Sequence, residues 1–140
     1  MRILLAAVLL MRGVQTPAEE YRCTYSRKVE CSDTGQCAAT EVGGAFLLIP
    51  HPDTLVVASR NARLDFTPAP QIRRCDNRGC SPFRVDAIRS GAFINVSLTG
   101  GGYFLKIAAE PTEEMKRWEF VESATSFLAT VTYWGACSIP

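Results

Sequence analysis

The sequence has a single histidine, His51, and lacks several motifs on which enzyme classes depend. A hydrolytic triad needs a base beside an activated nucleophile, and Gly-x-Ser-x-Gly does not occur. Cys-x-x-Cys is missing too, and Gly100-Gly101-Gly102 lacks the Gly-Lys-Ser/Thr of a phosphate-binding loop. We therefore expect no catalytic residue, no cofactor and no enzyme activity. His51, between two prolines, is interpreted as an exposed turn residue.

No apolar run is long enough to form a stable membrane span, which takes about 20 residues. The run over residues 3–11 has nine residues, follows Arg2 and precedes small residues. This order of charge, apolar core and small residues is typical of a secretory signal peptide. We expect residues 1–18 to be a signal peptide and residues 19–140 to form one secreted or periplasmic domain. The alternative is a buried N-terminal strand or helix.

A strong net charge is also missing. Removing Arg2 and Arg12 with the signal peptide leaves 13 Lys+Arg against 14 Asp+Glu, so we expect no nucleic-acid partner. The charges are unevenly spread, with arginines gathered over residues 60–89 and glutamates over residues 110–122. Opposite charges on neighbouring strands are the simpler explanation, and an anion-binding arginine face is the other.

Six cysteines lie in the mature chain, and an even number in a short exported domain indicates a disulfide framework. Two pairs flank short turns rich in Asp, Asn, Ser and Gly, which suits hairpins that bring two cysteines opposite each other. The remaining pair lies near the two ends of the mature chain. The predicted disulfides are Cys23–Cys137, Cys31–Cys37 and Cys75–Cys80.

A metal site is the alternative use of these cysteines. Zinc sites usually place paired cysteines about two to four residues apart and add a second pair of ligands. Here the two short gaps hold five and four residues, and His51, the only histidine, sits between two prolines. We therefore expect no metal.

Strand patterns dominate the mature chain, and no stretch gives a clear amphipathic helix. Period-two alternation or short apolar runs bounded by Gly and Pro predict strands. The main segments are residues 21–30, 45–49, 55–58, 63–66, 71–75, 83–87, 92–98, 103–109, 118–122 and 127–134. We expect an all-β fold, an antiparallel meander of about eight strands that closes into a small disulfide-stapled barrel, because closure removes exposed edges. A sandwich is the alternative.

Four acidic residues in expected strands are the candidates for carboxylate catalysis. Glycoside hydrolysis needs two carboxylates about 5 to 10 Å apart in a cleft. The four are Asp65, Asp86, Glu119 and Glu122. Solvated strand charges explain them more simply, so a carboxylate-dependent hydrolase of envelope material is the alternative function. A third hypothesis for the function is a lipocalin-like carrier that holds a small apolar ligand inside the barrel.

Two end motifs carry a family resemblance: Tyr21-Arg22-Cys23 near the start, and Trp134-Gly-Ala-Cys137 near the end. With the strand rhythm, they resemble small secreted or periplasmic β-proteins of Gram-negative bacteria. The pattern is also similar to the membrane-bound and periplasmic inhibitors of C-type lysozyme, which are eight-stranded barrels with terminal cysteines. Those inhibitors insert a Ser-Ala-Ser-Gly-like loop into the lysozyme cleft. This chain has only the segment 89–93, Arg-Ser-Gly-Ala-Phe, in a comparable hairpin.

Together these patterns predict a non-enzymatic, exported binding module, inhibitor-like, whose partner is an unknown protein or small ligand. Two arginine-containing loops are the first candidates, because arginine pairs with carboxylates in a bidentate way. The candidate binding residues are Arg89, Ser90 and Gly91, followed by Arg73, Arg74 and Arg78. Phe93 and Phe104 are expected on outer faces, where clustered aromatics can mark a partner surface, unless the strand phase is shifted by one residue.

Overall fold

The computed structural model describes residues 19–98, 101–113 and 116–138. The predicted signal peptide, residues 1–18, therefore lies outside the described residues. The described chain forms β1 (Glu20–Ser32), β2 (Cys37–Thr40), β3 (Phe46–Pro50), α1 (Pro52–Asp65), β4 (Gln71–Asp76), β5 (Gly79–Ser90), β6 (Phe93–Leu98), β7 (Tyr103–Ala108), β8 (Arg117–Thr125) and β9 (Ala129–Ser138).

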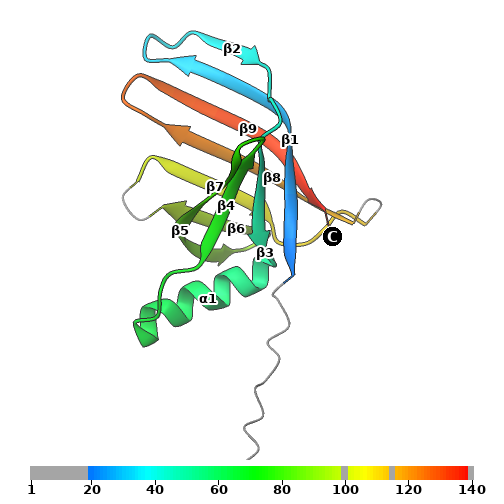
Figure 1. Cartoon of the computed structure of the whole chain (residues 1–140), viewed down its shortest axis with the longest axis vertical. Coiled ribbons are helices and arrows are strands. Elements are labelled where there is room, and N and C mark those ends of the chain that lie inside the picture. Colours follow the sequence, from blue (N-terminus) through cyan, green and yellow to red (C-terminus); the bar gives the residue numbers. More distant parts are fainter. Residues whose placement is uncertain (1–18, 99–100, 114–115, 139–140) are drawn as a thin grey trace, which may run out of the picture.

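Eight strands form a closed antiparallel barrel, as the sequence predicted. The strands follow one another in the order β1-β3-β4-β5-β6-β7-β8-β9, and β9 pairs back to β1. The lower half of β1 pairs with β3 over Glu20–Thr24, and its upper half pairs with β2 over Lys28–Cys31. β2 therefore extends the upper part of β1 as a hairpin outside the ring (Figure 1).

The prediction of strands over residues 55–58 and 63–66 was wrong, because this segment is the helix α1. His51 is the N-cap, Pro52 opens the first turn and Asp53 lies where a negative charge favours the helix dipole. Leu55 and Ser59 are buried one turn apart. The helix ends at Phe66, whose left-handed φ of 55° closes it. Asp65 is consequently on the helix and not on a strand.

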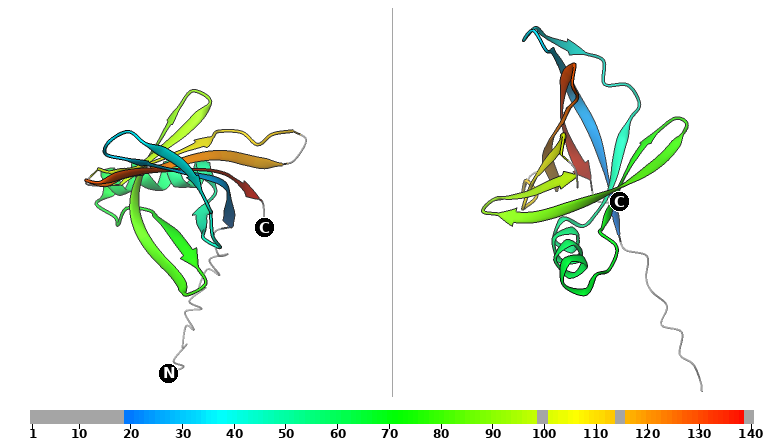
Figure 2. Two further views of the ribbon diagram at one scale, coloured as in Figure 1. Left: turned by 90° about the horizontal axis from the view of Figure 1, so that it is seen from above. Right: turned by 90° about the vertical axis from the view of Figure 1, so that its left-hand side faces the viewer.

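α1 covers one end of the barrel (Figure 1). β4 pairs with β5 from Asp76 and Gly79 to Gln71 and Arg84. Beyond Arg84, the edge of β5 that faces β4 has no strand neighbour. Here the main-chain N–H of Ala87 donates to Ser59 Oγ on α1 at 3.0 Å. The helix thus takes the place of a strand along this edge. We call the opposite end, where the β1–β2 and β4–β5 hairpins project, the distal end (Figure 2).

The barrel interior next to α1 is filled by apolar side chains. Period-two alternation directs one face of each strand inward, and the inward residues are almost inaccessible to solvent. The buried apolar side chains from the strands include Leu47, Ile49, Ile72, Val85, Ile94, Val96, Leu105, Ile107 and Phe120, and Leu55 of α1 packs with them. Phe93 and Phe104 remain 41% and 42% exposed, which confirms that they lie on the outer wall.

The three disulfides join the predicted cysteine pairs. Cys23–Cys137 links β1 to β9, the two strands that close the ring, over a sequence separation of 114. The other two bonds, Cys31–Cys37 and Cys75–Cys80, link the arms of hairpins over separations of 6 and 5. The first bond therefore fastens the seam of the barrel, and the other two fasten its projecting turns.

Candidate functional site

A buried ion pair crosses the interior of the barrel near the distal end. Arg74 lies on β4 and Glu122 on β8, and these strands are four places apart in the ring in either direction. Arg74 Nη2 donates to Glu122 Oε1, and Tyr25 Oη on β1 donates to Glu122 Oε2 at 2.5 Å. The Glu122 side chain is fully buried, whereas that of Arg74 is 38% exposed.

Strand phase places these polar residues inside. Glu122 continues the inward series Trp118 and Phe120 on β8, and Arg74 pairs across the sheet with the buried Leu47. A buried carboxylate is costly unless it is paired and hydrogen-bonded, and here both oxygens have donors. The interpretation of Glu122 as a solvated strand charge was therefore wrong, although the alternation of β8 carried the correct signal.

Three tyrosines surround this pair. Tyr25 packs against Tyr133 with ring centroids 4.6 Å apart and the rings tilted by 37°, and Tyr103 on β7 lines the same hollow as Arg74. Burial raises the pKa of Tyr25 and of Tyr103, while the positive charge of Arg74 partly offsets the rise at both. Both hydroxyls therefore stay protonated at neutral pH. Among the described residues, the buried hydroxyl of Tyr103 has no hydrogen-bond partner.

Arg74 reaches two hollows at the distal end. One, of about 290 Å³, is bounded by Arg74, Phe83, Leu98, Tyr103, Ala124 and Thr125. The second, of about 410 Å³, lies under the β4–β5 turn and includes Arg74, Arg78 and Ser81. We call the first of these the distal pocket. Its walls combine one guanidinium and one phenol with an apolar surface.

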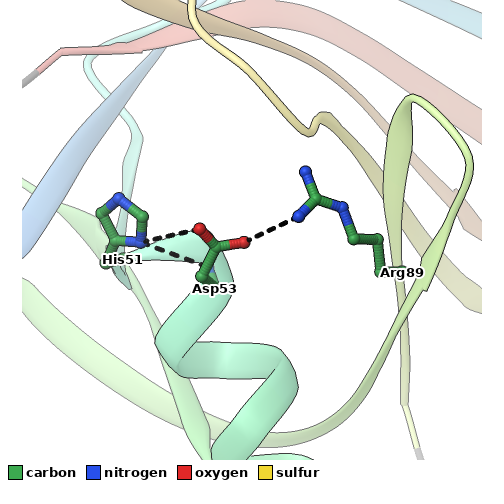
Figure 3. A network of polar contacts seen from close by, with 3 residues as sticks. All are labelled: His51, Asp53 and Arg89. Atoms are coloured by element: carbon green, nitrogen blue, oxygen red, sulfur yellow. Dashed lines mark hydrogen bonds and ion pairs between the residues drawn. The ribbon is translucent and has the colours of Figure 1, made fainter.

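At the helix end, a polar network ties α1 to the β5–β6 hairpin (Figure 3). The main-chain N–H of Asp53 donates to His51 Nδ1 at 3.2 Å, so this nitrogen acts as the acceptor of the helix cap. Arg89 Nη1 donates to Asp53 Oδ1 at 3.4 Å from the hairpin. The His51 ring also packs edge-on against Tyr21 and Trp118. His51 is thus a half-buried cap rather than an exposed turn residue, and its role here is structural.

A groove of about 380 Å³ runs between α1 and the edge of β5 that lacks a strand neighbour. Its floor and rim include the exposed apolar residues Leu64 and Ile88, which are 65% and 53% exposed. Its charged lining residues are Arg60, Arg63 and Arg89. We call this feature the α1–β5 groove.

The structure separates the predicted binding residues. Arg89, Ser90 and Gly91 lie at the helix end, where Gly91 has the positive φ of 58° that its tight turn needs. Arg74 and Arg78 share a hollow at the distal end. Arg73 faces the other side of β4, where it pairs with Glu20.

The four carboxylates considered for catalysis lie in different surroundings. Asp65 is exposed at the end of α1, and Glu119 is exposed on the outer wall of β8. Asp86 pairs with Arg63 and accepts from Ser59, both on α1. Glu122 is inside the barrel. The structure therefore gives each carboxylate its own neighbours instead of facing two of them across one cleft.

The outer wall carries a further hollow of about 390 Å³ between Phe93 and Trp134. Lys106 Nζ lies 3.8 Å from the centre of the Phe93 ring, and the Arg27 guanidinium lies 4.8 Å from that of Trp134. Each ring thus has a cation over its face, an arrangement that stabilises both groups.

Within residues 19–98, 101–113 and 116–138, no cluster of three or more His, Cys, Asp or Glu side chains is arranged to hold a metal ion. The helix in this part of the chain is too short and too polar to cross a membrane. Comparisons with protein-family models, with curated proteins and with solved structures gave no match. The class that the geometry defines is a disulfide-stapled, closed eight-stranded antiparallel barrel with one covering helix.

Proposed function

We propose that this chain is a non-enzymatic binding module, exported to an oxidising compartment such as the periplasm or the cell exterior. Its partner would be a protein that inserts an extended acidic segment into the α1–β5 groove. The observation that carries the proposal is the edge of β5 beyond Arg84, which continues past Gln71, the first residue of β4, and borders a groove lined with arginines.

The main chain of β5 supports an extended partner. In an antiparallel ladder, alternate residues direct their N–H and C=O groups to opposite edges. Val85 N–H donates to Pro70 O and Ala87 N–H to Ser59 Oγ, so the same edge presents the main-chain groups of Arg89. The N–H groups of Val85 and Ala87 are already bonded, so an added strand would pair with the main-chain groups of Arg89. Pairing of a partner strand at a sheet edge is the mode called β-augmentation.

The side chains of the groove support an acidic, partly apolar segment. Arg60, Arg63 and Arg89 supply donors that match carboxylates, while Leu64 and Ile88 supply apolar contact. Arg63 already pairs with Asp86 on β5, and Arg89 pairs with Asp53 on α1. Arg60 is therefore the arginine most free to meet a new carboxylate. Exposed apolar surface rimmed by charge is a common feature of binding sites.

A peptide experiment tests the proposal. An eight-residue peptide alternating Glu and Val, labelled with a fluorophore, should bind the mature protein saturably, and its Lys/Val counterpart should not. Arg60→Glu and Ile88→Asp should each weaken binding about tenfold, which corresponds to about 1.4 kcal/mol. Phe104→Asp, on the outer wall away from the groove, is the matched control. Equal binding of the acidic and basic peptides, or an effect of the control as large as that of Ile88→Asp, would exclude this site.

A further inference from the structure

We propose that the distal pocket binds a small monocarboxylate with a compact apolar body, held by Arg74 and Tyr103. This site is at the end of the barrel away from α1, so the inference stands independently of the α1–β5 groove. It rests on three features of residues that line one pocket: a charged donor fixed in place, a tyrosine whose buried hydroxyl has no partner among the described residues, and an apolar wall.

Arg74 is fixed as a donor before any ligand arrives. Glu122, fully buried on the opposite strand, accepts from one Nη of its guanidinium. A guanidinium has five N–H donors in a rigid plane, so several remain for another acceptor. Because the Arg74 side chain is 38% exposed and borders the distal pocket, those donors can reach a molecule inside it.

Tyr103 supplies the second, independent observation. Its side chain is 9% exposed and its hydroxyl is buried without a partner among the described residues. Leaving a buried polar group unpaired costs about 1 to 3 kcal/mol, so an unpartnered hydroxyl beside a pocket is a mark of a missing acceptor. Burial raises the pKa of Tyr103, which keeps its proton available for donation at neutral pH.

The pocket walls define the rest of the ligand. Phe83 meets the Tyr103 ring edge-on with centroids 5.3 Å apart, and Leu98 and Ala124 complete an apolar surface. The volume of about 290 Å³ is at the lower end of the range for small-molecule sites. An aromatic or short branched acid would place its body against this wall and its carboxylate toward Arg74.

The charges around the pocket argue against a ligand with two negative charges. Arg74 is already neutralised by Glu122, so the pair offers directed donors without a net positive charge. A doubly charged phosphate would be repelled by the Glu122 carboxylate and would lose its hydration against an apolar wall. Donors without surplus charge therefore suit a monocarboxylate.

Titration by NMR, with benzoate and isovalerate as probes, tests the assignment on the mature protein. Saturable shifts are expected for amides lining the pocket, with weaker or no binding of benzamide and of inorganic phosphate. Tyr103→Phe should weaken benzoate binding about tenfold without lowering thermal stability, because the hydroxyl it removes has no partner. Tyr21→Phe, which removes a hydroxyl at the helix end, is the matched control and should bind like the parent protein.

A double variant tests the second donor without leaving a buried carboxylate unpaired. Arg74→Gln with Glu122→Gln removes both charges together, and benzoate binding should again fall about tenfold while benzamide binding stays unchanged. The assignment is overturned by the absence of saturable binding of either acid, by equal affinity of Tyr103→Phe and the parent, or by equal binding of benzoate and benzamide.

Discussion

The ring of Phe120 on β8 packs against Gly135, its cross-strand partner on β9. A Cβ at Gly135 would stand 2.7 Å from two atoms of that ring and 2.1 Å from the main-chain oxygen of Thr24 on β1. Real Cβ atoms do not approach other atoms so closely. Gly135 therefore lets three strands meet around a buried aromatic ring, close to the β-bulge between Tyr25 and Arg27.

Replacing this glycine should strongly destabilise the barrel. Gly135→Ala must displace either the Phe120 ring or the backbone of β1, and overpacking of this kind typically costs about 1 to 3 kcal/mol or more. Urea unfolding should therefore show a lower midpoint with a similar slope. Gly44→Ala is the control, since an added Cβ there meets nothing within 4 Å, and its midpoint should match that of the parent. Equal midpoints for both variants would contradict this packing.

The three disulfides should contribute unequally to stability. In the chain-entropy model, a crosslink that closes about a hundred residues stabilises by about 4.7 kcal/mol, and a short loop stabilises considerably less. Replacing Cys23 and Cys137 together by Ala should lower the urea midpoint more than the same change at Cys31 and Cys37. The untreated protein should also show no free thiol in a denaturing titration. A larger loss from the short hairpin pair would contradict the predicted order.

Breaking the Arg74–Glu122 pair on one side only should cost more than removing both charges. Arg74→Met leaves a buried carboxylate with Tyr25 as its remaining donor, and we expect a loss of about 3 kcal/mol, the low end for buried pairs, because water reaches Arg74. Adding Glu122→Gln to this variant should restore a large part of the loss. Additive effects in this double-mutant cycle, measured by urea unfolding, would show that the two side chains do not interact.

Asp86 should contribute to stability at neutral pH and lose that contribution in acid. The hydrogen bond from Arg63 is the main reason why the pKa of Asp86 lies below its ordinary value, and Ser59 adds to it against the effect of burial. A folded-state pKa below the unfolded one of about 3.9 means that the stability is present above this pH and is lost as pH falls through the folded value.

The matching experiment compares Asp86→Asn with the parent. The variant should be modestly less stable near pH 7, because the pair is partly exposed to water, and the difference should shrink in acid, below the unfolded-state pKa of about 3.9. Asp65→Asn, exposed at the end of α1, is the control and should change little at either pH. A difference between Asp86→Asn and the parent that stays constant across this range would exclude the ion pair as its origin.

The likeness of the two end motifs to inhibitors of C-type lysozyme stays a prediction from the sequence, and an enzyme assay tests it. If the hairpin at Ser90 and Gly91 enters an enzyme cleft, the mature protein should slow lysis of bacterial cells by a C-type lysozyme at equimolar concentration. Ser90→Arg should remove that effect, because a bulky charge at the tip would not enter a narrow cleft. Unchanged lysis rates with the parent protein would reject this relationship.

The closed barrel could be predicted because its signals are local. Alternation in β5 to β7 has a period of two, and the two short cysteine pairs flank turns that bring their residues face to face. The third disulfide then followed from the remaining two cysteines. Its position across the β1–β9 seam agrees with ring closure.

The helix was missed because its apolar residues resemble a strand. Leu55-Val56-Val57-Ala58 has the β-branched character of a buried strand, and tertiary packing overrides such propensity. The helix signals were present in Pro52 and Asp53, but the two prolines around His51 were interpreted as a turn. A capping residue followed by Pro and Asp indicates a helix start more specifically than a turn.

The distal site could be predicted only in part. The inward phase of Glu122 follows from Trp118 and Phe120, so its burial was within reach of the sequence. Its partner was not, because Arg74 is 48 residues away on a strand that becomes opposite only when eight strands close into a ring. The partner therefore depends on strand number and register, which the sequence pattern alone does not define.

The bond between Cys23 and Cys137 also determines how the molecule responds to mechanical force. The two cysteines lie near the two ends of the described chain, so a pull applied to those ends passes through the sulfur–sulfur bond. The strands between the two cysteines therefore bear none of this force while the bond is intact. In an optical trap, the oxidised domain should lengthen by only the few residues outside the bond, and a reducing agent should release the remaining contour length in a separate step.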